Sequence, residues 1–140
     1  MVCAFVGNRS VYSPVKERLE VLLEQLIRQE GVRTFLVGDH GGFDRLVQSA
    51  LARLKVRYPC MDCAIVLCAP PLVSQNWPLP TVYPQELAGV MPQFALYKQN
   101  QWMIGRADLV VTYVEDPYSN AAKWAEYARK KGKRVVSVRG

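Results

Sequence analysis

A glycine-rich turn that also carries a histidine and two aspartates is the part of this sequence best suited to bind a ligand. It spans residues 38–44 and reads GDHGGFD. Glycines permit a sharp turn and leave backbone N–H groups open to an anion. The helix expected to follow directs the positive end of its dipole at the same place. The turn therefore predicts a site for a nucleotide or another phosphate-bearing small molecule.

Three charged or titratable side chains of this turn have suitable chemistry. His40 is the only histidine of the chain. An imidazole can transfer a proton near neutral pH, although a lone histidine in a loop more often serves as a hydrogen-bonding group. Asp39 would repel a phosphate, so we expect it to accept hydrogen bonds from ribose hydroxyls or a base. Asp44 suits the same site, or simply stabilises the first turn of the helix.

Arg9 adds a cation shortly after another apolar run, residues 2–6. A guanidinium there can hold a phosphate through two parallel hydrogen bonds, and the alternative is an ordinary surface arginine. Nothing indicates a Ser-His-Asp catalyst or metal catalysis, because the sequence has one histidine and no G-x-S-x-G segment. Cys60-x-x-Cys63 lacks the second ligand pair that zinc needs, so we expect no metal and no cofactor.

The composition limits the class of protein. With 140 residues and 50% hydrophobic residues, the chain should form one compact domain over residues 1–140. No apolar run reaches about 18 residues and no signal peptide is recognised, so we expect a cytoplasmic protein without a membrane partner. Much of the net charge of +6 comes from residues 129–134, which suit a solvated helix end. A face that binds nucleic acid is the alternative.

The elements that must position these residues alternate along the chain. Apolar runs predict strands at residues 2–6, 32–37, 64–69, 109–114 and 134–138. Helical periodicity predicts helices from Ser13-Pro14 to Gly31, from Phe43 to Tyr58, and over residues 94–104 and 121–130. This order predicts a three-layer α/β domain with a mostly parallel five-stranded sheet, which binds ligands at the carboxyl ends of its strands. A proline-rich, irregular insertion at about residues 70–93 leaves from the same edge.

Four segments, taken together and in order, resemble one protein family. They are FVGNR at residues 5–9, FLVGDHGGFD at residues 35–44, KQNQWMI at residues 98–104 and RADLVV at residues 106–111. The set resembles the YpsA-like branch of the SLOG superfamily, whose Rossmann-like members are related to DNA-processing protein A and to the Lonely Guy phosphoribohydrolases. The resemblance implies a single Rossmann-like domain that binds a nucleotide at the carboxyl edge of its sheet.

The sequence departs from the family's pattern in its phosphate-binding turns. Asn8 stands where the family's G-H-R turn has histidine, and Gln99 stands where its R-N-x-x-M segment has arginine. Ser119-Asn120-Ala121 replaces the family's G-G-T turn, although Glu126 matches the glutamate that follows that turn. The Lonely Guy enzymes use an arginine and a glutamate around the glycosidic bond, and of these two only the glutamate is matched here, by Glu126. The candidate catalytic residues are therefore Glu126, which would polarise the ribose, and Arg9, which would hold the phosphate.

The chemistry of the turn and the resemblance together predict a set of ligand-binding residues. They are Gly7, Asn8, Arg9, Gly38, Asp39, His40, Gly41, Gly42, Asp44, Asn100, Asp116, Ser119, Asn120 and Ala121. The favoured function is binding of a nucleotide or nucleotide-derived small molecule, as a sensor or ligand-binding protein. The first alternative is a nucleoside-monophosphate phosphoribohydrolase. The second is binding of single-stranded nucleic acid, which ranks last because the basic run shows no clear aromatic platform beside it. The oligomeric state stays open, a homo-oligomer included.

Overall fold

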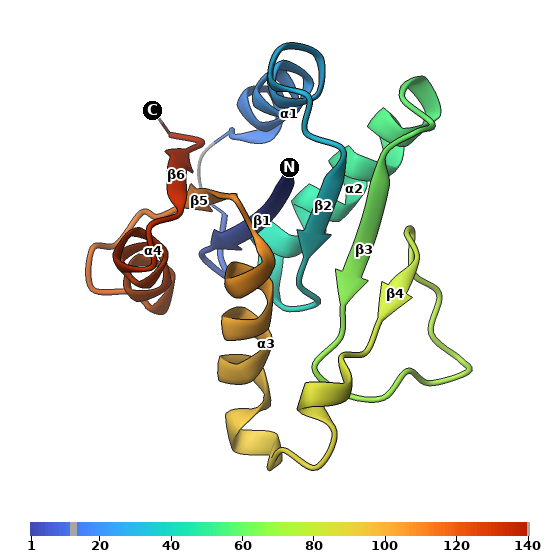
Figure 1. The fold of residues 1–140 in the computed structure, drawn as a ribbon, viewed down its shortest axis with the longest axis vertical. Coiled ribbons are helices and arrows are strands. Elements are labelled where there is room, and N and C mark those ends of the chain that lie inside the picture. Colours follow the sequence, from blue (N-terminus) through green and yellow to red (C-terminus); the bar gives the residue numbers. More distant parts are fainter. Residues whose placement is uncertain (12–13, 140) are drawn as a thin grey trace.

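The computed structural model describes residues 1–11 and 14–139 and shows a three-layer α/β fold (Figure 1). Its sheet contains β1 (Val2–Gly7), β2 (Thr34–Val37), β3 (Asp62–Val66), β4 (Thr81–Val82), β5 (Leu109–Tyr113) and β6 (Arg134–Ser137). Its helices are α1 (Lys16–Glu30), α2 (Gly41–Arg57), the short 3-10 helix η1 (Gln85–Leu87), α3 (Pro92–Arg106) and α4 (Asn120–Lys130). In the described part of the chain, no helix combines the length and apolar character needed to cross a bilayer. The predicted alternation of strands and helices is confirmed.

The sheet has six strands in the order β4-β3-β2-β1-β5-β6, and all neighbouring strands are parallel. The predicted parallel sheet is confirmed, but the predicted number of five strands is wrong. The additional strand is β4, whose two residues are too few to show a period-2 pattern. The N–H of Ile65 donates to the carbonyl oxygen of Pro80 and the N–H of Leu67 to that of Val82, both over 2.8 Å. Prolines are tolerated beside such an edge strand, so the proline-rich insertion contains β4 and η1 and is not irregular throughout.

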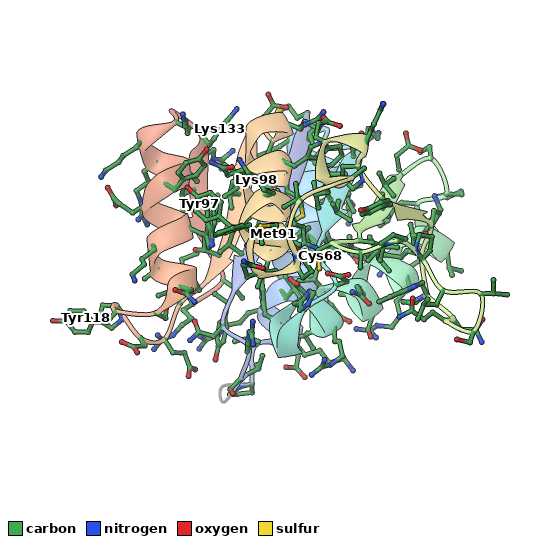
Figure 2. The ribbon with its side chains drawn as sticks, turned by 90° about the horizontal axis from the view of Figure 1, so that it is seen from below. Cys68, Met91, Tyr97, Lys98, Tyr118 and Lys133 are labelled. Carbon is green, nitrogen blue, oxygen red and sulfur yellow. The ribbon has the colours of Figure 1, made fainter. Side chains whose placement is uncertain are left out.

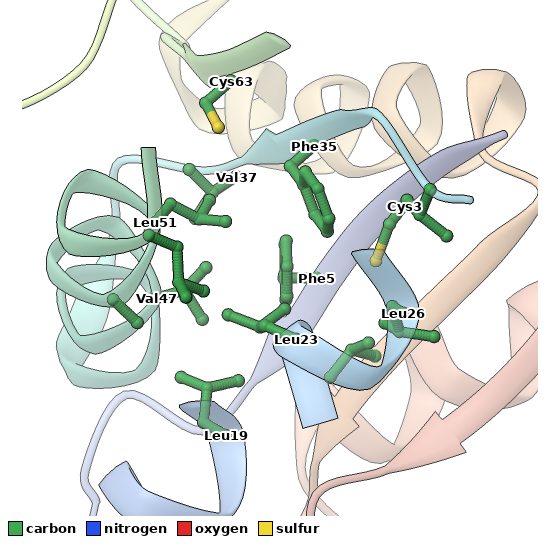
Figure 3. Packing of buried hydrophobic residues seen from close by; sticks show 14 of the residues in the cluster. Cys3, Phe5, Leu19, Leu23, Leu26, Phe35, Val37, Val47, Leu51 and Cys63 are labelled. Atoms are coloured by element: carbon green, nitrogen blue, oxygen red, sulfur yellow. The ribbon is translucent and has the colours of Figure 1, made fainter. Parts of the chain in front are cut away.

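Different helices cover the two faces of the sheet. α1 and α2 pack on the face that holds Cys3 and Phe5, in the cluster shown in Figure 3. α3 and α4 cover the opposite face, which holds Ala4 and Val6. Alternate residues of β1 therefore point into separate cores, as a pleated strand requires. Because both faces are covered, the central strands are almost continuously apolar.

The helix ends agree with the predictions in part. Gly31 ends α1 in the left-handed conformation, with φ of 70°, which confirms the predicted glycine cap. The predicted start of this helix at Pro14 is wrong, because α1 begins at Lys16 with Val15 as its cap residue. Ser13, the predicted cap, lies outside the described residues. α3 begins at Pro92, where a proline fits because the first helical N–H needs no partner within the helix.

Candidate functional site

A cavity of about 470 Å³ lies at the carboxyl ends of β1, β2 and β5, between α3 and the start of α4. Among the predicted residues, those that line it are Gly7, Asn8, Arg9, His40, Asp44, Asn100, Ser119, Asn120 and Ala121. The other lining residues are Phe5, Val6, Gln93, Leu96, Tyr97, Gln99 and Trp124. Gly38, Asp39, Gly41, Gly42 and Asp116 were also predicted but do not line it. Ligands bind at this edge of parallel α/β sheets.

The cavity has two walls of different origin. One is the turn wall, formed by Arg9, His40 and Asp44 from the loops after β1 and β2. The other is the helix wall, formed by Tyr97 and Trp124 together with residues 119–121. Residues from both halves of the sequence therefore meet in one place, as expected for a site at the edge of a parallel sheet.

Two glycines of the turn allow the loop after β1 to pack directly against α2. A Cβ at Gly42 would lie 2.6 Å from the carbonyl oxygen of Arg9, and a Cβ at Gly41 would lie 3.0 Å from the Cα of Arg9. Gly41 also has φ of 90°, in the left-handed region that favours glycine. The N–H of Gly42 donates to the same Arg9 carbonyl oxygen over 2.6 Å. These contacts fix the backbone of Arg9 beside the cavity.

The side chain of Asp44 bonds to the backbone of the turn that precedes it. Its carboxylate accepts a hydrogen bond from the N–H of His40 over 3.1 Å. A Cβ at Gly38 would lie 2.7 Å from the same carboxylate, so the glycine leaves the space that Asp44 occupies. Burial raises the pKa of the Asp44 carboxyl to about 7, and the charge of Asp39 adds to the rise. The hydrogen bond from the N–H of His40 acts in the opposite direction and lowers this pKa. Near neutral pH the turn wall is therefore less negative than its sequence implies.

Gln99 connects α3 to the same turn. Its side chain is buried, and its Nε2 donates to Asp39 Oδ1 over 2.7 Å and to the carbonyl oxygen of Val66 over 2.6 Å. Asp39 Oδ1 also lies 2.6 Å from His40 Nδ1, and Asp39 Oδ2 accepts from the N–H of Cys68 over 3.3 Å. The carboxylate of Asp39 is thus engaged within the protein. Its contact with a ribose or a base stays a prediction.

The first turn of α4 is held by Ser119. The hydroxyl of Ser119 accepts from the N–H of Ala122 over 3.2 Å and donates to the carbonyl oxygen of Asp116 over 2.7 Å. Asp116 shapes this loop, since its carboxylate accepts from the N–H of Tyr118 over 2.9 Å. The first N–H groups of a helix have no partner within the helix, so the start of α4 is suited to an anion.

Aromatic side chains of α3 and α4 form a part of the cavity that the sequence interpretation missed. The ring centroids of Tyr97 and Trp124 lie 5.0 Å apart, and those of Trp124 and Tyr127 lie 5.1 Å apart. Tyr97 is 52% exposed and lies between the two helices (Figure 2). Lys131 Nζ lies 5.5 Å from the centroid of Tyr127. An aromatic platform does lie beside the basic run. On α4 and just beyond its end, Trp124, Tyr127 and Lys131 follow one another at three- and four-residue spacing, which could have indicated this part of it.

Glu126 does not line this cavity. It is exposed, forms an ion pair with Arg129 over 3.4 Å, and lines a different hollow together with Thr112. A helix turns by about 100° per residue, so Glu126 points about 200° around α4 from Trp124. The structure therefore does not bring Glu126 and Arg9, the candidate catalytic residues, into one site.

A larger hollow of about 780 Å³ lies between α1 and α2. Ion pairs line it, including Arg53 with Glu20 and Arg57 with Glu24. Ion pairs exposed to solvent contribute little to stability. None of the predicted ligand-binding residues lines this hollow. The smaller cavity at the carboxyl edge is therefore the candidate site.

The two cysteines of the C-x-x-C segment lie in different surroundings. Cys60 is exposed, whereas Cys63 is buried in the core between the sheet and α2. Burial raises the pKa of the Cys63 thiol to about 11. The interpretation of this pair as structural or incidental stays a prediction.

The fold and the cavity together define a Rossmann-like α/β domain with a ligand-sized cavity at the carboxyl edge of a parallel sheet. The sequence matches no family model, and no curated protein matches it significantly. Solved structures do resemble it. The X-ray structure of DNA processing protein A from Streptococcus pneumoniae matches with a TM-score of 0.70 and 15% identity, over 96% of this chain and 49% of that chain. A structure of DNA processing protein A from Helicobacter pylori, described for its single-stranded DNA binding mode, matches with a TM-score of 0.64 and 16% identity, over 98% of this chain and 64% of that chain.

At such identities the likeness shows the fold alone. It confirms the predicted Rossmann-like fold, which the two chains of DNA processing protein A share. This chain spans about half of the first of those chains and less than two thirds of the second. Membership of the YpsA-like branch and the link to the Lonely Guy enzymes stay predictions.

Proposed function

We propose that this chain binds single-stranded nucleic acid and holds one nucleotide unit in the cavity at the carboxyl edge of the sheet. The observation that carries the proposal is that one cavity is lined by an arginine, a helix N-terminus and an aromatic pair. The first two groups suit a phosphate, and the third suits a base. The ranking of this function below small-molecule binding depended on the apparent lack of an aromatic platform.

The phosphate of the bound unit lies between Arg9 and the start of α4. Arg9 supplies a guanidinium that can donate two parallel hydrogen bonds to phosphate oxygens. The backbone N–H groups of Asn120 and Ala121 add donors and the positive end of the helix dipole. The raised pKa of Asp44 limits the repulsion between the opposite wall and this phosphate.

The base of the same unit stacks on the aromatic pair of Tyr97 and Trp124. Stacking of a base on an aromatic side chain contributes about 1–3 kcal/mol and depends little on which base is present. Leu96 extends the apolar part of this wall, and the amides of Gln93 and Asn100 provide donors and acceptors at its edge. The cavity therefore favours nucleotides without strong selection among bases.

Basic side chains continue from the cavity across the outer surface of α3 and α4. Lys98 is exposed next to Tyr97 (Figure 2). Lys131 is exposed just beyond the end of α4. Together with the net charge of +6, they favour the phosphate backbone of a longer strand. The single-stranded DNA binding described for the Helicobacter pylori protein of similar fold supports the same class of ligand here.

Fluorescence anisotropy with a labelled oligothymidine tests the proposal. The affinity should fall steeply as salt rises, because bound phosphates release counterions. Arg9→Ala should weaken binding by about 1 kcal/mol or more and reduce the salt slope by about one. The matched control is Arg28→Ala on α1, which removes an exposed arginine that does not line the cavity. No binding at low salt, or equal effects of the two substitutions, would contradict the proposal.

Binding of a free nucleotide is the second candidate, and the size of the cavity favours it. Its volume of about 470 Å³ lies within the range of roughly 300–1,000 Å³ found for small-molecule sites. A nucleoside monophosphate that binds the native state should raise Tm, and the stabilisation should grow with the logarithm of its concentration above Kd. If oligonucleotides of increasing length bind no more tightly than a nucleoside monophosphate, binding of a free nucleotide is favoured over strand binding.

A further inference from the structure

Three side chains of different chemistry meet at the ends of β2 and β3, next to the cavity. The carboxylate of Asp39, the imidazole of His40 and the thiol of Cys68 each place one ligand atom within 4.8 Å of the other two. Figure 2, viewed from below, labels Cys68. We propose that these three side chains bind a divalent transition-metal ion, and that Zn²⁺ fits them best. The proposal does not depend on nucleic-acid binding.

The distances among the three groups are close to those around a bound ion. Zinc–ligand bonds of about 2.0–2.3 Å at tetrahedral angles separate neighbouring ligand atoms by about 3.3–3.6 Å. Cys68 Sγ lies 3.7 Å from His40 Nδ1 and 3.8 Å from His40 Nε2. Asp39 Oδ1 and His40 Nδ1 are 2.6 Å apart and share a hydrogen bond. An ion that replaces the shared proton needs this pair to open by about 0.7 Å, within the reach of a half-exposed imidazole.

The chemical types of the ligands select the class of metal. A thiolate, an imidazole and a carboxylate together suit Zn²⁺ and related transition metals. Mg²⁺ and Ca²⁺ require oxygen ligands, of which this cluster offers only the carboxylate of Asp39. The thiol of Cys68 gains little from its neighbours by hydrogen bonding alone, because a thiol is a weak donor and acceptor.

The protein around the cluster holds two of the ligands in place. Gln99 Nε2 donates to Asp39 Oδ1 over 2.7 Å, and the N–H of Cys68 donates to Asp39 Oδ2 over 3.3 Å. Such outer hydrogen bonds orient metal ligands and raise affinity. β2 and β3 are hydrogen-bonded neighbours, so the segments that carry the ligands are fixed relative to one another. Asp39 and the backbone of Cys68 are thus held by hydrogen bonds within the protein, and the exposed imidazole of His40 is the ligand that adjusts.

Three protein ligands leave a fourth position of a tetrahedral ion for water or another molecule. His40 is the member of the cluster that also lines the cavity. A bound ion would therefore lie at the edge of the turn wall. The site has the three-ligand form of zinc sites that bind exogenous molecules, and differs from the closed four-ligand form of structural zinc sites.

Co²⁺ and Zn²⁺ titrations of the chelator-treated full chain, without nucleic acid, test the proposal. We expect one Co²⁺ per chain, with thiolate-to-cobalt charge-transfer absorption and the intense visible bands of a tetrahedral site. Zn²⁺ should displace it. Cys68→Ser should abolish the charge-transfer absorption and weaken Zn²⁺ binding by at least about tenfold, and His40→Gln should weaken it similarly.

Cys60→Ser is the matched control, because Cys60 is the exposed cysteine and lies outside the cluster. It should leave the stoichiometry, the spectrum and the affinity unchanged. Circular dichroism of each variant separates lost folding from lost binding. The proposal is overturned if the wild-type chain shows no thiolate–cobalt absorption, or if Cys68→Ser keeps it while Cys60→Ser removes it.

Discussion

The two walls of the cavity differ in how far their polar groups are already engaged within the protein. On the turn wall, the N–H of His40 donates to Asp44, and the backbone carbonyl of Arg9 accepts from Gly42. On the helix wall, Tyr97 is half exposed, and the first N–H groups of α4 have no partner within the helix. One wall is closed by its own hydrogen bonds, whereas the other presents groups that a ligand can contact.

This difference shows that a glycine-rich turn can contribute to a site mainly by positioning neighbouring segments, without contacting the ligand itself. The glycines let the loop after β1 approach α2 closely, and this approach sets where Arg9 stands. The groups that suit a base and a phosphate come largely from α3 and α4, which carry no glycine-rich motif at the cavity. Substitutions of the glycines that pack the turn wall should therefore act mainly on folding, whereas substitutions of Arg9 and of the aromatic side chains of the helix wall should act mainly on binding.

The largest expected effect comes from Gly7→Ala, at the base of the turn wall. An added Cβ would lie 2.1 Å from Phe43 Cδ2, and Phe43 is fully buried and stacked on Tyr113 with ring centroids 5.6 Å apart. The added Cβ would also lie 2.7 Å from Phe43 Cβ, which rotation of the ring does not relieve, so we expect the free energy of unfolding to fall by about 3 kcal/mol or more. Urea denaturation measures this.

Gly105→Ala is the control for that substitution. Nothing lies within 4 Å of a Cβ at Gly105, which is in the last turn of α3. Alanine in a helix is favoured over glycine by up to about 1 kcal/mol, so this variant should be slightly more stable than the wild type. Equal losses in the two variants would show that close packing of the turn wall is not what Gly7 provides.

The next largest effect is expected from Trp124→Ala on the helix wall, and it concerns binding. Loss of one stacking surface should weaken oligothymidine binding by about 1–3 kcal/mol. Tyr118→Ala is the control, because Tyr118 is 87% exposed and does not line the cavity. The comparison of the walls fails if Trp124→Ala binds as tightly as Tyr118→Ala.

The sequence predicted the layers, the parallel sheet and the turn wall because their signals are local. Apolar runs, helical periodicity and the GDHGGFD turn each lie within a few residues. The predicted cap Gly31 and the position of Arg9 at the cavity follow from such signals. The two-residue β4 was missed because no periodicity can be read in so short a segment.

The remainder of the site depends on contacts between distant segments. Gln99 lies 60 residues from Asp39, and Cys68 lies 28 residues from His40, so neither pairing is visible in the sequence. The direction of Glu126 is a different case. The two-residue spacing on a helix already directs Glu126 away from Trp124. Glu126 was nevertheless assigned to the site because it matches the glutamate of the family motif.

A smaller effect is expected from Asp44→Asn, as a change in the pH dependence of stability. The pKa of Asp44 is raised from 3.8 to about 7, so between these values the native state binds a proton that the unfolded state has lost. The free energy of unfolding should therefore fall as pH rises through this window, by up to about 1.4 kcal/mol per pH unit from this group. Asp44→Asn lacks this contribution. Denaturation at pH 5, 6 and 7 should give a smaller decline for the variant, and parallel curves would show that Asp44 is not held protonated.

The smallest expected effect, about 1 kcal/mol, comes from Ser119→Ala on the helix wall. It removes the hydroxyl that accepts from the N–H of Ala122 and caps α4. Ser74→Ala, in an exposed loop, should change stability by less than about 0.5 kcal/mol.

Ser119→Asp separates capping from ligand binding at the same position. Aspartate caps a helix about as well as serine, so stability should be retained. Its charge would stand where we place the phosphate, so oligothymidine affinity should fall further than in Ser119→Ala. Equal affinities of the two variants would show that the phosphate does not bind at the start of α4. Arg9 on the turn wall would then be its principal contact, and the division of roles between the two walls would be reversed.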